Sequence, residues 1–247
     1  MPIISSLFPV LKWMHTFEPS VSYNYTPHVN QSRLPSFDSV DQIPFTNAIT
    51  YGFTQRLVGK PTTDTTNKVN SGPFEYAKMQ IFQSYSLGHT FSDLDGNKNA
   101  FSNIRGEFWW NFSPYLSAHW DGEYNPHKLN FDINEASLVV KDNREDALVV
   151  GYFFTKGNIK GLNVDLRLKV LPPLFIYGAV RYDLLDGYRV ENLYGIEYRA
   201  QCWTAGLVVE DINSSPDGLQ QKELRYQFYF NLMGLGTRGR MLDFMYY

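Results

Sequence analysis

The sequence predicts an all-β fold: an antiparallel transmembrane β-barrel of about twelve strands. Apolar residues recur at every second position over runs of about ten residues, which is the period of a strand with two different faces. Turn-forming residues separate these runs. Tryptophan and tyrosine gather near the ends of the runs, where a membrane interface favours rings that carry a hydrogen-bonding group.

Two runs alternate without a break, and they define the two expected faces. In 162–170 the apolar positions are Leu162, Val164, Leu166, Leu168 and Val170, and the polar ones are Asn163, Asp165, Arg167 and Lys169. In 224–232 the first face carries Leu224, Tyr226, Phe228, Phe230 and Leu232, and the second carries Arg225, Gln227, Tyr229 and Asn231. Because successive strand side chains point to opposite faces, each run separates an apolar face from a polar one.

Ten further runs complete the expected set. They are 17–25, 45–57, 77–87, 104–112, 116–124, 129–140, 148–154, 174–183, 194–200 and 203–209. The alternation changes parity near Glu135, which indicates a β-bulge. Turns are expected at Asn125-Pro126, Lys141-Asp142-Asn143, Pro172-Pro173 and Asp186-Gly187. The polar stretches 27–43 and 58–73 are expected to be loops, so a single barrel domain is expected over 14–236, with a C-terminal tail at 237–247.

The composition limits the classes of function. The chain has 247 residues, 22 Lys+Arg against 25 Asp+Glu and a net charge of -3, so it lacks the basic surface that nucleic-acid binding needs. No apolar run approaches the length of a membrane helix, which excludes spanning helices but leaves spanning strands open. Residues 1–11 are apolar but have no basic region before them, so they make a poor secretory signal. Residues 1–13 are expected to be a leader or the remnant of a preceding strand, and the chain is expected either to be cytoplasmic or to be a piece of a longer protein.

Three segments carry a resemblance to a known family. Residues 15–39 read HTFEPSVSYNYTPHVNQSRLPSFDS, residues 193–210 read LYGIEYRAQCWTAGLVVE, and residues 226–236 read YQFYFNLMGLG. Their order and spacing resemble those of the lipopolysaccharide-assembly outer-membrane protein family LptD. The resemblance covers essentially the whole chain from about residue 14. It corresponds to the C-terminal half of the family's barrel.

The resemblance implies a function in the cell outer membrane. Proteins of this family deliver lipopolysaccharide to the outer leaflet through a lateral opening between the first and last strands of a large barrel. The implied partners are lipopolysaccharide, an LptE-like plug lipoprotein, a periplasmic Lpt bridge reached through an N-terminal domain, the barrel-assembly machinery and membrane lipid. Such transport involves no covalent chemistry, so neither enzymatic activity nor a cofactor is expected.

The resemblance also suggests roles for individual residues. Cys202, the one cysteine in the chain, is expected at a periplasmic turn and could form a disulfide with the absent N-terminal domain; the alternative is a lone reduced thiol. The lateral-gate strand would be 224–232, with Leu224, Tyr226, Phe228, Phe230 and Leu232 facing lipid. The expected lumen-facing residues are Asp165, Arg167, Lys169, Arg181, Asp183, Glu197, Arg199 and Arg225. They could guide phosphorylated sugars, but solvation of a water-filled interior is the favoured interpretation.

Other residue patterns have simpler explanations. His119, Asp121 and Glu123 alternate on one strand and could be a metal or acid–base site, but a hydrated lumen wall accounts for them better. Asp93, Asp95 and Asn97 resemble part of a calcium loop, but the acidic residue at its twelfth position is missing, so a turn is expected.

Two rival functions are compatible with the strand pattern. The first is an outer-membrane channel or lipid-active enzyme of about twelve strands. An enzyme such as a phospholipase would need a serine activated by a nearby histidine, and no Ser–His pairing at a suggestive spacing stands out in the sequence. A soluble lipid-binding barrel would invert the two faces, so that the apolar side chains would be buried inside.

Overall fold

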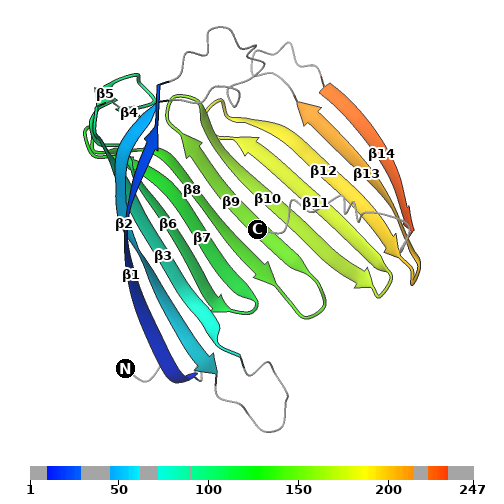
Figure 1. Cartoon of the computed structure of the whole chain (residues 1–247). Coiled ribbons are helices and arrows are strands. Elements are labelled where there is room, and N and C mark those ends of the chain that lie inside the picture. The colour runs from blue at the N-terminus through cyan, green and yellow to red at the C-terminus, as the bar shows by residue number, and fades with distance from the viewer. Residues whose placement is uncertain (1–9, 29–44, 62–71, 89–90, 214–221, 233–247) are drawn as a thin grey trace. The chain divides into compact units, whose positions relative to one another are not determined.

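The computed structural model describes residues 10–28, 45–61, 72–88, 91–213 and 222–232, and every regular element in these ranges is a β-strand (Figure 1). The strands are β1 (Val10–Thr26), β2 (Thr46–Pro61), β3 (Phe74–Ser86), β4 (Phe91–Ser92), β5 (Lys98–Asn99), β6 (Ile104–Ser113), β7 (Leu116–Asn125), β8 (Asn130–Lys141), β9 (Ala147–Thr155), β10 (Ile159–Leu171), β11 (Leu174–Asp183), β12 (Tyr188–Arg199), β13 (Trp203–Asn213) and β14 (Lys222–Leu232). Across the described ranges, no helix has the length and apolar character needed to cross a membrane.

The twelve long strands form one antiparallel sheet, in the order β1-β2-β3-β6-β7-β8-β9-β10-β11-β12-β13-β14. Each long strand therefore lies beside its neighbours in sequence, and β4 and β5 form a separate hairpin. By contact density the chain divides into unit 1, residues 1–111 and 119–134, and unit 2, residues 112–118 and 135–247.

The connections between successive antiparallel strands alternate between two ends. We call one the loop end, because it includes the long connections 27–45 and 87–103 as well as 156–158, 184–187 and 214–221. The other is the turn end, whose connections are 62–73 between β2 and β3 and the shorter ones 114–115, 142–146, 172–173 and 200–202.

In unit 1, the pairing of β1, β2 and β3 separates a mainly apolar face from a polar one. Tyr51 pairs with Val21 of β1 and with Gln83 of β3, and Phe53 pairs with Pro19 and Ile81. On the other face Thr50 and Ser84 share a hydrogen bond of 2.8 Å between their hydroxyl oxygens. At the loop end of this unit, the β4–β5 hairpin is closed by the Asp93 side chain.

In unit 2, the buried core lies on the same face as the charged residues. Its buried apolar side chains are Phe175, Tyr177, Ala179 and Val208. Buried Arg167 and Glu197 belong to this same face, which is the reverse of the distribution expected for a water-soluble sheet protein.

All twelve predicted strands are present, but several bounds differ from the prediction. β11 has the predicted bounds, whereas β12 begins at Tyr188, six residues before the predicted start. Residues 58–61, expected to be loop, continue β2, because they pair with β1. The exposed apolar residues of β8 change from an odd-numbered position, Phe131, to even-numbered ones, Leu138 and Val140. This agrees with the expected change of parity near Glu135.

The expectation that tryptophan and tyrosine lie near strand ends is wrong for three residues. Trp109 lies in the middle of β6, Trp120 in the middle of β7 and Tyr194 in the middle of β12. The Trp120 indole donates a hydrogen bond from Nε1 to Asn134 Oδ1 at 2.7 Å, so its N–H group has an acceptor on the neighbouring strand β8. The predicted features at 1–9, 29–43, 62–71, 214–218 and 233–247 lie outside the described residues.

Candidate functional site

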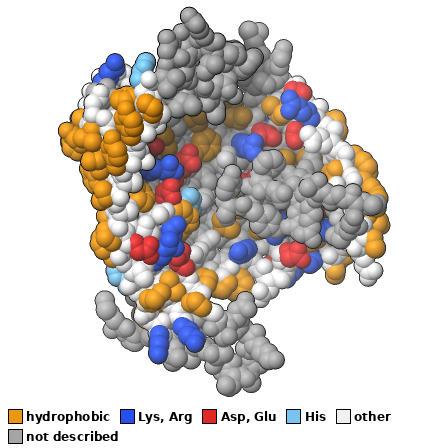
Figure 2. Space-filling model, in the orientation of Figure 1, with side chains coloured by type: hydrophobic (Ala, Val, Ile, Leu, Met, Phe, Trp, Pro, Cys, Tyr) orange, Lys and Arg blue, Asp and Glu red, His pale blue; other side chains and the backbone are white. Residues whose placement is uncertain are grey.

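The strand register of unit 2 defines two faces, which we name the apolar face and the charged face. Leu166 of β10 pairs with Gly178, which pairs with Tyr194, and this row continues through Val209 to Tyr226 of β14. This is the apolar face. All of the predicted lumen-facing residues have the opposite parity and form the charged face: Asp165, Arg167, Lys169, Arg181, Asp183, Glu197, Arg199 and Arg225. Figure 2 shows acidic and basic side chains next to one another on the face turned to the viewer.

A hydrogen-bonded group on the charged face is centred on Glu197 of β12, whose residue is only 6% exposed. The Tyr177 hydroxyl of β11 donates to Glu197 Oε1 at 3.0 Å. Arg199 donates from Nε to the same oxygen and from Nη2 to the Tyr177 hydroxyl at 2.9 Å. Tyr229 of β14 donates its hydroxyl to Glu197 Oε2. The carboxylate therefore has donors on both oxygens, which is the condition for burying its charge.

Gly206 allows β14 to take part in this group. Gly206 of β13 pairs with Glu197 on one side and with Tyr229 on the other. The Tyr229 ring crosses β13 at this glycine, because a Cβ there would overlap the ring. The absence of a side chain at Gly206 thus permits a contact between strands that are not neighbours.

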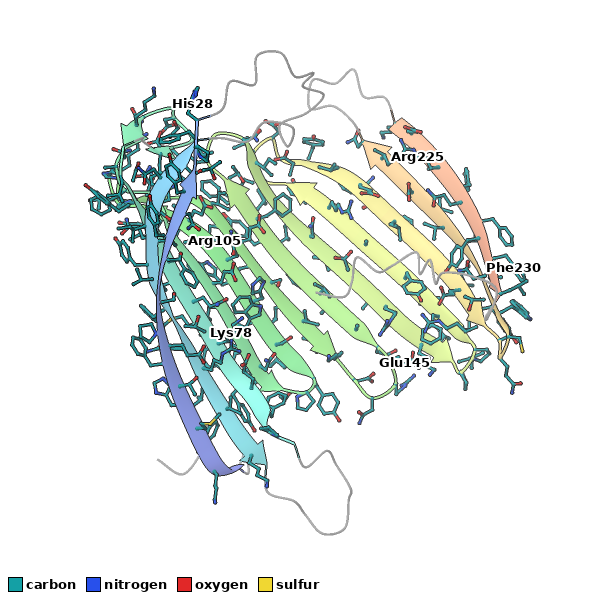
Figure 3. The ribbon with its side chains drawn as sticks, in the orientation of Figure 1. His28, Lys78, Arg105, Glu145, Arg225 and Phe230 are labelled. Atoms are coloured by element: carbon teal, nitrogen blue, oxygen red, sulfur yellow. The ribbon has the colours of Figure 1, made fainter. Side chains whose placement is uncertain are left out.

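The group extends to the turn end through Glu145, in the connection between β8 and β9 (Figure 3). Lys169 Nζ lies 2.7 Å from Glu145 Oε1, and Arg199 Nη1 lies 3.3 Å from Glu145 Oε2. The hydrogen bond from Lys169, with the positive charges of Arg199 and Arg167, lowers the pKa of the Glu145 carboxyl. Arg167 Nε also donates to the Glu145 backbone oxygen at 2.8 Å. We call Glu145, Lys169, Tyr177, Glu197, Arg199 and Tyr229 the Glu197 cluster.

Phe175 is the apolar floor of the Glu197 cluster. It is 1% exposed, and the Arg199 guanidinium carbon lies 4.0 Å from its ring centroid. Lys169 Nζ lies 5.3 Å from the same centroid. Two cations over one ring, both also bound to carboxylates, make a packed and rigid arrangement.

The other predicted lumen residues lie outside the cluster. Arg181 pairs with Glu191 at 2.7 Å, and Arg225 pairs with Glu223 at the same distance. Asp165 pairs in register with Ala179, and Asp183 pairs with Gly161 at the loop end. The two arginines therefore carry acidic partners, as expected on a solvated polar face.

β14 is the last strand in the sheet order, and β13 is its described neighbour. Its predicted gate residues, Leu224, Tyr226, Phe228, Phe230 and Leu232, have the parity of the apolar face. Phe230 stacks on Trp203 with a centroid separation of 5.7 Å. Figure 3 shows Phe230 and Arg225 on this strand. That it forms a lateral gate stays a prediction.

Cys202 lies in the 200–202 connection between β12 and β13, at the turn end. Its thiol is exposed and unbonded in the described part of the chain. This position matches the predicted turn. A disulfide to another segment stays a prediction.

The two patterns in unit 1 that resembled metal sites have other partners. His119 stacks on Trp109 at 4.9 Å, and Asp121 accepts a hydrogen bond from Arg105 Nη2 at 3.2 Å. In the ranges that the structure describes, no group of three or more His, Cys, Asp or Glu residues could hold a metal ion.

The Asp93 segment forms a turn, as its sequence predicts. Asp93 Oδ1 accepts from the backbone N–H groups of Asp95 at 3.0 Å and Asn97 at 2.8 Å. Lys128 Nζ lies 2.9 Å from Asp93 Oδ2, and its hydrogen bond holds the pKa of this carboxyl far below its ordinary value.

Sequence reasoning missed Glu145, Tyr177 and Tyr229 as members of the central cluster. For the two tyrosines a signal was available, because each lies at a charged-face position and pairs with a glycine on a neighbouring strand: Tyr177 with Gly195 and Tyr229 with Gly206. Glu145 gives no periodic signal, because it lies in a turn with a left-handed backbone (φ 75°).

Comparison with known proteins places the chain in a family. The family model described as "LptD: LPS transport system D" matches residues 10–188. The chain is 25% identical over 258 residues to the LPS-assembly protein LptD of Burkholderia lata, with 91% of this chain and 31% of that protein covered. It is 24% identical over 250 residues to the protein of the same name from Nitrosococcus oceani, with 92% and 32% covered. The chain thus spans about a third of the length of these relatives. Because the family model matches more than half of its residues, the chain belongs to the LptD family.

Proposed function

We propose that this chain contributes twelve strands to an outer-membrane β-barrel that delivers lipopolysaccharide to the outer leaflet. Relatives named LPS-assembly proteins support the substrate, and the antiparallel sheet supports the barrel architecture. The apolar face would contact lipid, and the charged face would line the lumen.

The distribution of exposure carries this proposal. Phe228 is 74% exposed and Tyr226 is 66% exposed on the apolar face, whereas Glu197 and Arg167 are buried on the charged face. A soluble barrel would bury its large apolar side chains and leave the charged ones in water. The observed distribution suits a strand set with hydrocarbon on one side and a hydrated interior on the other.

The charged face suits the passage of a polar glycan. Its arginines carry acidic partners, so the face offers hydrogen-bonding groups without a strong field of one sign. A hydrated sugar chain could slide along such a surface without binding tightly. The lipid part of the substrate would leave beside β14, the last strand of the order, because an end strand is the place where a sheet can open sideways.

The partners of the whole protein are part of the same proposal. An LptE-like plug lipoprotein would pack against the charged face, where the Glu197 cluster offers a rigid surface. A periplasmic Lpt bridge would deliver substrate through an N-terminal domain, and the barrel-assembly machinery would insert the strands. Because delivery moves the lipid without making or breaking covalent bonds, the proposal includes no enzymatic step.

A crosslinking experiment in cells tests this function. A photoreactive amino acid replaces Gln227 on the charged side of β14 or, in a second variant, Phe228 on its apolar side, within the complete polypeptide. Newly made lipopolysaccharide is pulse-labelled before illumination. We expect adducts of labelled lipopolysaccharide at Gln227 during the pulse and adducts of bulk membrane lipid at Phe228.

Three results separate the possibilities. Lipid adducts at Phe228 without lipopolysaccharide at Gln227 would retain the membrane barrel but contradict the transport route, as for an outer-membrane channel or lipid-active enzyme. Lipid adducts at Gln227 alone, in a protein that stays soluble without detergent, would indicate a soluble lipid-binding barrel. Labelled adducts at Gln227 that disappear when lipopolysaccharide synthesis is blocked support the proposed function.

A further inference from the structure

The apolar face of β9–β14 carries its charged residues near one end only. Among the described residues of these strands, the register places four on this face: Lys160, Arg189, Asp211 and Lys222. All four lie near the loop end. The turn end of the same face presents rings such as Tyr198 and Trp203 instead.

Arg189 is on this face because of a break in the register. Tyr182 pairs with Leu162 of the apolar face, and Arg189 pairs with Tyr182 after a bulge between Arg181 and Tyr182. The bulge turns Arg189 to the apolar side while its neighbour along the ladder, Glu191, still pairs with Arg181 on the charged side. A bulge that redirects one side chain is a common feature of functional positions in sheets.

The Arg189 guanidinium is held in place but remains half-exposed. Its Nη2 lies 3.1 Å from Asp211 Oδ2. With the Asn192 amide turned so that its oxygen faces the arginine, Oδ1 accepts from Nε at 2.9 Å and from Nη1 at 3.0 Å. These contacts use three of the five N–H groups of an arginine, which leaves two for another acceptor. The side chain is thus ordered before any ligand arrives, which reduces the entropy cost of binding.

Asn213 connects Arg189 of β12 with Lys222 of β14. Its Nδ2 donates to the Arg189 backbone oxygen at 3.1 Å, while its Oδ1 is buried and has no hydrogen-bond partner in the described part of the structure. Asn213 pairs directly with Lys222. A ligand at this place would therefore meet two cations, Arg189 and Lys222, that attract phosphate.

From these cations toward the turn end, the apolar face carries exposed apolar side chains. Tyr194 of β12 pairs with Val209 of β13, which pairs with Tyr226 of β14, and both tyrosines are more than half exposed. A head that carries phosphate and hydroxyl groups, attached to acyl chains that run along this row, matches the arrangement in both charge and polarity.

We propose that Arg189 and Lys222 bind the headgroup of a phosphorylated glucosamine lipid of the outer leaflet, the lipid A portion of lipopolysaccharide, on the outside of the sheet. The inference rests on the proposed membrane position, with the loop end at the cell exterior. The site is separate from the charged face, through which the glycan would pass. It would hold a lipid molecule against β12, β13 and β14.

Arg181 provides a closely matched control. Arg181 and Arg189 each form one ion pair with an acidic residue on the neighbouring strand, at 2.7 Å and 3.1 Å, and their side chains are 48% and 50% exposed. They lie near the same end and differ in the face to which they point. Loss of one cation near the loop end is therefore common to Arg181→Gln and Arg189→Gln, and only Arg189→Gln removes it from the proposed site.

The experiment measures lipid binding by the complete polypeptide, purified from outer membranes into nanodiscs of phosphatidylcholine. Bis-phosphorylated lipid A is added at increasing mole fractions, and bound lipid is counted by native mass spectrometry. We expect Arg189→Gln to weaken retention by about tenfold or more, because charge-assisted hydrogen bonds are lost. Adding Lys222→Gln should weaken retention further. Arg181→Gln should change it by less than about twofold. Dephosphorylated lipid A should bind weakly to every form.

Three results would contradict the proposed lipid site. Equal losses in the Arg181→Gln and Arg189→Gln variants would show a general charge effect. Equal retention of dephosphorylated lipid A would exclude phosphate recognition, and equal displacement by phosphatidylglycerol would exclude recognition of the sugar headgroup. Recovery of wild-type protein in the outer membrane, shown by heat-modifiable migration on gels, keeps a failure of the site separate from a failure of the proposed function.

Discussion

Tyr229 on β14 donates a hydrogen bond to Glu197 on β12, although β13 lies between the two strands. The contact crosses β13 at Gly206. The last strand of the sheet is thus fastened on the charged face by a side-chain hydrogen bond as well as by its backbone ladder. The strand that would form the gate can be loosened by changing one residue of its neighbour.

We expect Gly206→Ala to destabilise the folded barrel by about 1 to 3 kcal/mol, because the new methyl group displaces Tyr229 and leaves Glu197 with fewer donors. Urea unfolding in a bilayer or detergent measures the effect. Gly178→Ala is the control, because no heavy atom lies within 4 Å of a Cβ built at Gly178. Similar losses in the two variants would contradict the role of the Tyr229 contact.

Arginine substitutions test which face meets lipid. Leu166→Arg or Phe228→Arg should impair membrane assembly by about 2 to 4 kcal/mol, because a charge near the bilayer midplane loses its hydration. Asn163→Arg and Gln227→Arg place the same side chain on the charged face and should be tolerated. Folding yield into lipid vesicles gives the ranking, and the opposite ranking would favour the soluble barrel.

The strands could be predicted from the sequence because their period-2 pattern is local. All twelve long strands follow from it, and the turns near Pro172 and Gly187 follow from local turn-forming residues. The Glu197 cluster could not be predicted, because it depends on register: Tyr229 reaches Glu197 only when Gly206 lies between them. Arg189 was missed for a related reason, since a bulge changes its face without altering the composition of the run.

The stability of unit 2 should depend on pH through Glu145. The hydrogen bond from Lys169 makes the pKa of Glu145 lower in the folded state than in the unfolded state, so the folded state binds fewer protons. This contribution is complete above the ordinary value of about 4.3 and disappears as the pH falls through the lowered folded value. Because the pair is partly exposed, it amounts to no more than about 1 kcal/mol.

Unfolding free energies from pH 6 down to pH 3 check this dependence. We expect the difference between wild type and Glu145→Gln to shrink across the interval, and Lys169→Gln to remove most of the same dependence. A difference that stays constant with pH would show that the carboxylate charge is not involved.

Cys202 should form a disulfide with sequence outside this chain. In the complete polypeptide, a non-reducing gel should show a mobility shift that Cys202→Ser abolishes, because a periplasmic turn lies in an oxidising compartment. Full alkylation of Cys202 in the mature, membrane-inserted protein would indicate a free thiol instead.

The central claim is that the apolar face of unit 2 lies against lipid, and a spin-label scan of β10 tests it most directly. Single cysteines at each position from 162 to 170, in a Cys202→Ser background, carry a nitroxide in the bilayer-reconstituted protein. The account predicts high collision rates with lipid-soluble oxygen at Leu162, Val164, Leu166, Leu168 and Val170. Collisions with a water-soluble nickel complex are expected to exceed those with oxygen at Asn163 and Asp165, whereas position 167 is buried and should collide little with either reagent. The reverse alternation, or none, would contradict it.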